Sequence, residues 1–294
     1  MTKSVPMISA RGPSLWDRFW RRLLRHRLGM LGLSMLVVLV LTATLAPTVA
    51  RKDPSSTNLR ERNQPPSAAH ILGTDGVGRD VWARLVYGSR VSLSVGIVAV
   101  GIYATIGVLL GSIAGYMGGH VDNAIMRFTD MMMSFPTLLL IITAAAVLPP
   151  SIINVMIIIG IFGWTHMCRL VRGQFLSLRE QEFVVAALSY GAPWNRIVFR
   201  HMLPNVVGPI VVACTLGLAG AILTEASLSF LGLGVQQPTP SWGSTLHTAM
   251  ELPTLEGMPW RWIPAGLAIA LTVLSVNFAG DGIRDALDPR TVLD

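Results

Sequence analysis

The chain has 294 residues, of which 52% are hydrophobic and only 13% are charged, with a formal net charge of +7. A soluble protein of this size would lack the polar residues needed to cover its surface, so the composition argues against an ordinary soluble protein and favours a membrane protein. The excess of Lys and Arg lies beside apolar segments without an aromatic-interleaved basic face, which argues against nucleic acid as a partner.

The N-terminal part of the chain predicts one membrane anchor between two polar segments. Residues 1–27 are rich in Arg and form an expected cytoplasmic tail. The first apolar run, residues 28–50, carries no charge and, at about 1.5 Å per residue, exceeds the ~30 Å hydrocarbon core. It is too long and begins too late for a cleaved signal, so we expect a retained first transmembrane helix. Residues 51–90 are polar and contain Pro54, Pro65 and Pro66, and we expect them to form an external segment.

The remainder predicts a helical core over residues 91–280. Five further spans are expected, over residues 91–119, 131–148, 151–168, 205–224 and 263–280. Gly101, Gly107, Gly111 and Gly115 recur at helical spacing and predict a small-residue stripe for close helix packing. Residues 226–262 contain Gly and Pro that would leave backbone groups unsatisfied in lipid, so we expect an external or re-entrant segment there. The predicted fold class is an all-α polytopic membrane protein with six transmembrane helices.

The distribution of Lys and Arg predicts how these spans are oriented. Six spans place both termini on one side of the membrane, together with a loop over residues 171–204 and a C-terminal tail over residues 281–294. Of the Lys and Arg residues, 15 fall in the segments on this side and eight on the other. The positive-inside rule therefore predicts that both termini and this loop are cytoplasmic.

The loop before the fifth span contains the most informative motif. Ala186 and Ala187 lie near the end of a helix-prone run, Gly191 can supply the left-handed residue that stops a helix, and Pro193 suits the first turn of the next one. The pattern predicts a helix, a tight turn and a second helix. Two neighbouring alanines would let the groove of a partner protein approach the backbone closely.

This loop resembles the EAA loop by which the permeases of binding-protein-dependent ABC importers contact their ATPase. The shared pattern is Ala-Ala, three residues, Gly, eleven residues and Leu-Pro. Val185 stands where many members have Glu, and His201 where many have Ile, although the His-x-Leu-Pro-Asn ending resembles the peptide and nickel importer branch. The alternative is a solvated connecting loop. The resemblance implies a set of ATPase-coupling residues: Glu182, Ala186, Ala187, Gly191, His201, Leu203 and Pro204.

A second stretch, residues 70–93, resembles the segment before the second span in the C-type permease of the dipeptide/oligopeptide family. Asp80 and Arg84 are four residues apart and are expected to support a short helix. Asp75, Arg79 and Asp80 have two interpretations. They form either a structural cap for the second span or an external gate that contacts a solute-binding protein.

Two further groups of residues are candidates by their position beside predicted spans. Glu225 directly follows the fifth span, and the resemblance places it with Trp242 in the outer segment. Glu225 is expected either to bind neighbouring backbone or Arg groups or, with Trp242, to line an outer gate or binding-protein contact. Arg127 and Asp130 are three residues apart and predict an ion pair within one helix.

The motifs that are missing restrict the function. No G-x-x-x-x-G-K-[ST] loop occurs, so ATP and Mg are expected on separate ATPase subunits. No H-E-x-x-H or G-x-S-x-G motif occurs, so we expect neither an enzyme nor a bound metal or cofactor. A stand-alone secondary transporter or channel would need ionisable residues deep within its spans, and we expect none in spans one to four or six.

The resemblance implies a transport assembly in the bacterial inner membrane. Its expected partners are a homologous second permease, two ATPase subunits, an extracytoplasmic solute-binding protein and membrane lipid. The implied solutes are di- and oligopeptides, with nickel chelates and glutathione as alternatives. ATP-driven movement of the loop would switch the pathway between inward and outward access.

Overall fold

The computed structural model describes residues 15–287, and within that range the chain forms helices joined by turns and loops, with no β-strand. The predicted tail residues 1–14 and 288–294 lie outside the described part. The helices are α1 (Leu15–Arg25), α2 (Arg27–Thr44), α3 (Ala46–Ala50), η1 (Leu59–Glu61), α4 (Val81–Met117), α5 (Gly119–Met133), α6 (Thr137–Val147), α7 (Ile152–Arg179), α8 (Glu182–Ser189), α9 (Trp194–Arg196), η2 (Ile197–Met202), α10 (Leu203–Phe230), α11 (Trp242–His247), α12 (Leu252–Gly257), η3 (Pro259–Arg261) and α13 (Ile263–Leu287).

Five helical segments are long and apolar enough to cross a membrane, namely α2, α4, α7, the continuous α9–η2–α10 segment and α13. The predicted third span is built differently, because α5 and α6 meet at a bend of 78° and count as a sixth span only when taken together. With 11 residues, α6 alone is about 16 Å long, roughly half of the hydrocarbon core. Pro136 is the N-cap of α6 and cannot donate a hydrogen bond to the preceding turn, which explains the break. The predicted all-α polytopic fold is confirmed.

Several helices extend beyond the apolar runs from which they were predicted. The second span belongs to a helix that begins at Val81, where the carboxylate of Asp80 accepts a hydrogen bond from the Ala83 N–H at 2.8 Å. The fifth extends to Phe230 and the sixth to Leu287. Apolar patterning shows where a helix lies in lipid, whereas caps decide where it ends.

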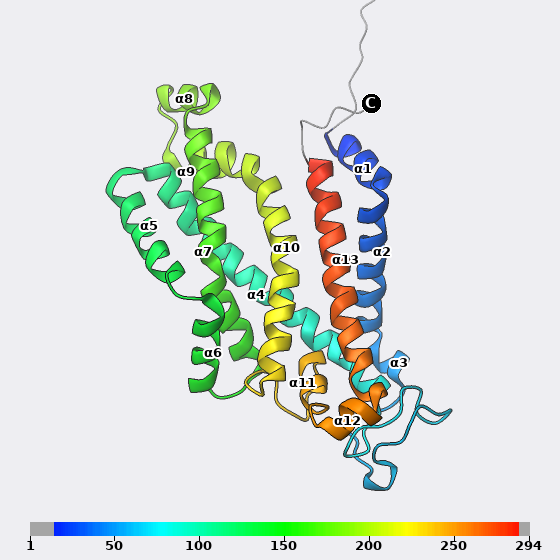
Figure 1. Ribbon diagram of the computed structural model, residues 1–294. Coiled ribbons are helices and arrows are strands. Elements are labelled where there is room, and N and C mark those ends of the chain that lie inside the picture. Colours follow the sequence, from blue (N-terminus) through cyan, green and yellow to red (C-terminus); the bar gives the residue numbers. More distant parts are fainter. Residues whose placement is uncertain (1–14, 288–294) are drawn as a thin grey trace, which may run out of the picture.

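Figure 1 shows two groups of helices bridged by α4, which crosses the molecule obliquely. On one side α2 packs against α13, and on the other α4 packs along α7. The start of α1, the end of α13 and α8 lie at one end of the molecule, which we call the α8 end. The loop over residues 51–80, α3, α11 and α12 lie at the opposite end, which we call the α11 end. The two described ends of the chain thus share a side, as six spans require.

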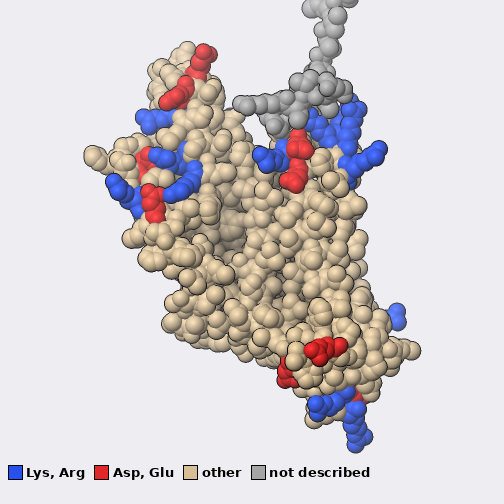
Figure 2. Space-filling model, in the orientation of Figure 1, with Lys and Arg blue, Asp and Glu red and all other residues tan. Residues whose placement is uncertain are grey.

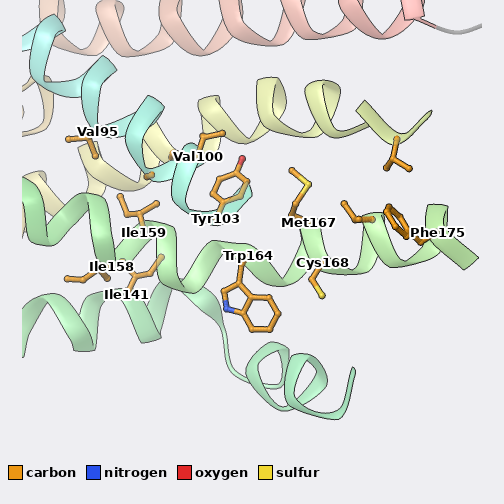
Figure 3. Packing of buried hydrophobic residues seen from close by; sticks show 14 of the residues in the cluster. Val95, Val100, Tyr103, Ile141, Ile158, Ile159, Trp164, Met167, Cys168 and Phe175 are labelled. Atoms are coloured by element: carbon orange, nitrogen blue, oxygen red, sulfur yellow. The ribbon is translucent and has the colours of Figure 1, made fainter. Parts of the chain in front are cut away.

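The predicted glycine stripe forms the contact between α4 and α7. A Cβ atom on Gly111 would lie 2.5 Å from the carbonyl oxygen of Cys168, and Gly107 and Gly115 approach Cβ atoms of α7 equally closely. Gly101 has open space around it, so the prediction is confirmed for three of the four glycines. The main apolar core of the described chain surrounds this contact (Figure 3).

Two ion pairs connect α5 to α7. Arg172 donates to Asp122 with its Nη2 atom at 2.7 Å, and Arg169 pairs with Asp130. The predicted pair between Arg127 and Asp130 within one helix is therefore wrong. Asp130 is directed across to the neighbouring helix instead.

Candidate functional site

The ending of α8 shows why Gly191 is needed in this loop. Gly191 has φ of +71°, in the left-handed region that favours glycine. The Ala192 N–H donates to the Ala187 carbonyl at 3.1 Å, and the Gly191 N–H donates to the Leu188 carbonyl at 2.9 Å. Together these bonds form a Schellman motif, which satisfies the last carbonyl groups of the helix. The predicted helix stop at Gly191 is confirmed.

Most of the α8 helix is exposed, and only Val184 is fully buried against the rest of the chain. Ala186 is exposed, whereas Ala187 is half-buried and packs against the main core. Tyr190 is 91% exposed, the largest value among the exposed large hydrophobic side chains of the described chain. We call the exposed group the α8 surface, which consists of Phe183, Val185, Ala186, Leu188 and Tyr190. Apolar side chains gathered in this way at the end of a helix are typical of a protein contact.

The chain then turns into α9 and the π-helical η2 segment. Pro193 is the N-cap of α9 rather than a residue of its first turn, because its extended backbone precedes the helix. Pro204 has no N–H, so the carbonyl four residues earlier loses its usual donor, and the turn before it widens. The Asn205 side chain donates to the neighbouring His201 carbonyl at 2.6 Å and adds a bond across this turn. The Leu-Pro-Asn sequence therefore sets the shape of this joint.

A shallow hollow of about 520 Å³ adjoins the α8 surface. Two exposed arginines, Arg196 and Arg200, give it positive charge. Leu203 is half-buried beneath it and packs on the main core, and Glu182 begins α8 in an exposed position. The residues that line the hollow are Pro193, Asn195, Arg196, Phe199, Arg200 and Pro204. Figure 2 shows charged side chains gathered at the two ends, with an uncharged band between them on the face in view.

At the α11 end, Asp75 organises a turn of buried charges. Its carboxylate accepts bonds from the Arg79 backbone N–H at 2.9 Å and from the Arg79 Nε at 2.7 Å. Arg79 also bonds to Gln237, and Arg84 lies 4.0 Å from Asp75. Arg84 is 1% exposed, and its Nε and Nη2 atoms have no hydrogen-bond partner within the described chain. The turn is thus tied to both α4 and the segment after α10.

Asp80 forms a second buried cluster beside this turn. Besides capping α4, its carboxylate lies 2.8 Å from the His70 Nδ1 atom and 3.6 Å from the Lys52 Nζ atom. The predicted support of Asp80 by Arg84 is therefore wrong, since both side chains bond elsewhere. These contacts attach the loop over residues 51–80 to the start of α4.

Arg261 attaches the same segment to α11 and α12. It donates to the Thr248 carbonyl at 2.6 Å, the Thr254 hydroxyl at 3.0 Å and the Asn63 side chain at 3.2 Å. Burial lowers the pKa of Arg261, and the negative charge of Asp75 opposes that shift. The cluster forms one connected polar network with the preceding two.

Glu225 is fully buried and bound by serine hydroxyls, not by the backbone or Arg groups that were expected. Ser92 and Ser229 each donate to its carboxylate at 2.8 Å. Trp242 is 1% exposed and donates from its indole to the Leu85 carbonyl at 3.1 Å. These bonds connect α4, α10 and α11 at the point where the helices leave the apolar core.

The outer residues singled out from the sequence are all buried, with Asp75, Arg79 and Asp80 between 4% and 6% exposed. Their burial favours the interpretation as a structural cap, because a buried side chain cannot contact a second protein directly. A role in an outer gate remains a prediction.

Sequence reasoning missed a functional candidate in the middle of the molecule. His166 lies in the predicted fourth span and lines a cavity between α4, α6, α7 and α10. The expectation that spans one to four contain no ionisable residue is therefore wrong. The signal was available, since a histidine interrupts an apolar run, but its neighbours Tyr103 and Thr137 are distant in sequence.

These features define a class: a multi-pass helical membrane protein with an exposed, apolar helical loop at one end. Comparison of the sequence with models of known protein families identifies the family. Residues 107–293 match the model of the binding-protein-dependent transport system inner membrane component, and residues 14–66 match the N-terminal transmembrane domain of oligopeptide transport permease C. The chain belongs to the family of binding-protein-dependent transport system inner membrane components, and the resemblance inferred from its loops is confirmed.

Similar proteins match the chain over nearly its full length. The oligopeptide transport system permease protein OppC of Bacillus subtilis is 43% identical, covering 96% of this chain and 92% of that protein. The dipeptide transport system permease protein DppC of Alkalihalophilus pseudofirmus is also 43% identical, over 94% and 90%. A putative peptide permease protein of Brucella suis is 40% identical, over 100% and 96%.

Proposed function

We propose that this chain is the C-type permease of an ATP-binding cassette importer that carries di- or oligopeptides across the bacterial inner membrane. The names of its relatives support peptides as the solute class. Nickel chelates and glutathione are the alternatives, because a solute-binding protein usually selects the solute before the permease receives it. Uptake of labelled di- and oligopeptides by the assembled importer tests this assignment, and uptake of a nickel chelate alone would contradict it.

The observation that carries the proposal is the α8 surface. It is apolar, lies beyond the helix bundle and surrounds Ala186, whose small side chain leaves the backbone approachable. A groove on an ATPase subunit is the partner that such a helix fits. The adjoining arginines, Arg196 and Arg200, suit acidic groups at the rim of that groove. The proposed assembly contains a homologous second permease, two ATPases that hold ATP and Mg, and an extracytoplasmic solute-binding protein.

The way α8 is attached fits a coupling role. Val184 anchors the helix, and the Schellman motif fixes its end against the start of α9. Movement of a bound ATPase would therefore displace α8 as one body and pull on η2 and α10, which follow directly in the chain. The widened π-helical turn gives that joint a conformation able to change.

Ala186→Arg is the sharpest test of this contact. The exposed side chain leaves room for Arg in the isolated chain, but its bulk would separate α8 from the ATPase groove. We expect loss of ATPase copurification and of solute uptake, with unchanged insertion in the membrane. Ala68→Arg is the matched control, because Ala68 is also exposed but lies at the α11 end. Normal copurification with the Ala186 variant would contradict the coupling assignment.

The proposed orientation places the α8 end and both termini in the cytoplasm. The larger number of Lys and Arg residues in those segments supports it. Single cysteines at Tyr190 and Arg60, introduced after replacing Cys168 and Cys214, test it with a membrane-impermeant thiol reagent. We expect position 60 to react from outside and position 190 only from inside, and the reverse pattern would invert the topology.

A further inference from the structure

A cavity of about 420 Å³ lies midway along α7, between α4, α6 and α10. Most of its lining is apolar or glycine, but His166, Tyr103 and Thr137 bring polar atoms to it. Its lining residues include no Asp, Glu, Lys or Arg. The cavity therefore contains one imidazole and a few hydroxyl groups in otherwise apolar surroundings.

Three polar side chains of this cavity are free to bind another molecule, whereas the fourth, Thr224, donates its hydroxyl to the Gly220 carbonyl. Within the described residues, the side chains of His166, Thr137 and Tyr103 make no hydrogen bond. Tyr103 points its hydroxyl towards α10 (Figure 3), where Gly217 has no Cβ atom that would overlap it. Each of these side chains can donate a hydrogen bond.

The position of His166 in the middle of α7 argues that the cavity it lines does not face lipid. Its side chain is exposed in the single chain, although it lies at the centre of a membrane-length helix. An imidazole in hydrocarbon would lose its hydrogen bonds to water, and ionisable residues within spans accordingly face water-filled paths or other protein groups. The next arginines along α7, Arg169 and Arg172, are paired with Asp130 and Asp122 and do not line the cavity.

We propose that His166 contacts the transported solute during its passage and binds an anionic group, such as the carboxylate of a peptide. The inference rests on the proposed function and extends it to a residue that determines solute preference. A carboxylate is the complementary group, because the cavity offers several donors and no carboxylate of its own to accept from them. Tyr103 and Thr137 would add neutral donors on either side.

The test uses the complete importer with its ATPases and solute-binding protein in proteoliposomes. Uptake of a dipeptide with a free carboxylate is compared with uptake of its C-terminal amide, each at saturating loaded binding protein. In His166→Leu, we expect the maximal uptake rate of the free dipeptide to fall about tenfold, the size of one lost charge-assisted hydrogen bond, and the rate of the amide to change little. His166→Gln keeps a neutral donor and should lie between the two.

His120→Leu is the matched control, because it makes the same change at an exposed histidine of α5 that does not line the cavity. Stimulation of ATP hydrolysis by the loaded binding protein reports assembly in every variant and should stay near wild type. Equal uptake of the free dipeptide by His166→Leu and wild type would overturn the inference, as would equal losses for dipeptide and amide. If the wild-type assembly imports neither peptide, the proposed function fails instead.

Discussion

The two ends of the molecule differ in which side chains they bury and which they expose. At the α11 end, charged residues such as Asp75, Arg79 and Asp80 are buried and bound to other parts of the same chain. At the α8 end, apolar residues such as Tyr190 and Val185 are exposed on a short helix with a single buried anchor. The polar groups of the first end are bound within the chain, whereas the exposed apolar groups of the second form the proposed contact with another protein. A substitution should therefore impair folding at one end and assembly at the other.

The largest effect on stability is expected for Asp75→Ala. Removing the carboxylate leaves Arg79 and the buried Arg84 without their negative partner, which costs about 3–5 kcal/mol for a buried pair. Thermal unfolding of the purified chain in detergent measures the loss. Asp53→Ala is the control, because Asp53 is exposed and bonds only to the neighbouring Ser55. Equal stability of the two variants would remove the contrast between the ends.

Tyr190→Ala should show the opposite behaviour at the α8 end. The 91% exposed ring contributes little to the isolated chain, so its unfolding should change by less than about 0.5 kcal/mol. Binding of the ATPase should weaken by about 2 kcal/mol, the scale of an aromatic residue at the centre of an interface. Titration of the ATPase onto the detergent-solubilised permease measures it. Unchanged affinity would show that the contact lies elsewhere on α8.

Gly191→Ala tests how far the loop conformation itself matters. A Cβ atom has room there, but φ of +71° costs an L-residue about 1–2 kcal/mol. We expect weaker ATPase copurification, with a free energy of unfolding lowered by no more than this cost. Gly257→Ala is matched, since it also has open space but lacks a positive φ. Similar copurification by both variants would assign the turn no special role.

Asp130→Asn should have the smallest effect. Its side chain and that of Arg169 are 57% and 47% exposed, so water and salt screen the ion pair. We expect a change in stability of at most about 1 kcal/mol, and less at high ionic strength. Unfolding measured at low and high salt provides the check. A large, salt-independent loss would contradict the solvent exposure of this pair.

The sequence predicted the features that depend on local spacing. Gly107, Gly111 and Gly115 lie on one face of any helix that contains them. A glycine that follows a helix-prone run, such as Gly191, commonly ends the helix. The sequence could not predict Gly101 as an exception, because the path of α7 leaves that position uncovered. The bend at Pro136 could not be predicted, because it lies within one apolar run and hydropathy does not report the direction of a helix axis.

Contacts between residues far apart in the chain could not be predicted from the sequence. Glu225 finds Ser92 133 residues away, and Asp122 finds Arg172 50 residues away. For Asp130 the sequence predicts a pair with Arg127, the nearest opposite charge along the helix, because a sequence shows only such local spacing. The tertiary fold supplied better partners.

The length of α4 has a mechanical consequence. Its 37 residues give it a length of about 55 Å, more than the thickness of the hydrocarbon core, and Figure 1 shows that it crosses the molecule obliquely. One end is held by the Asp80 cap at the α11 end, and Gly115 near the other packs on α7, the helix before α8. Changing its slope therefore moves both faces of the transporter at once. Lipids of different acyl-chain length, which favour different slopes, should change the transport rate without altering any contact residue.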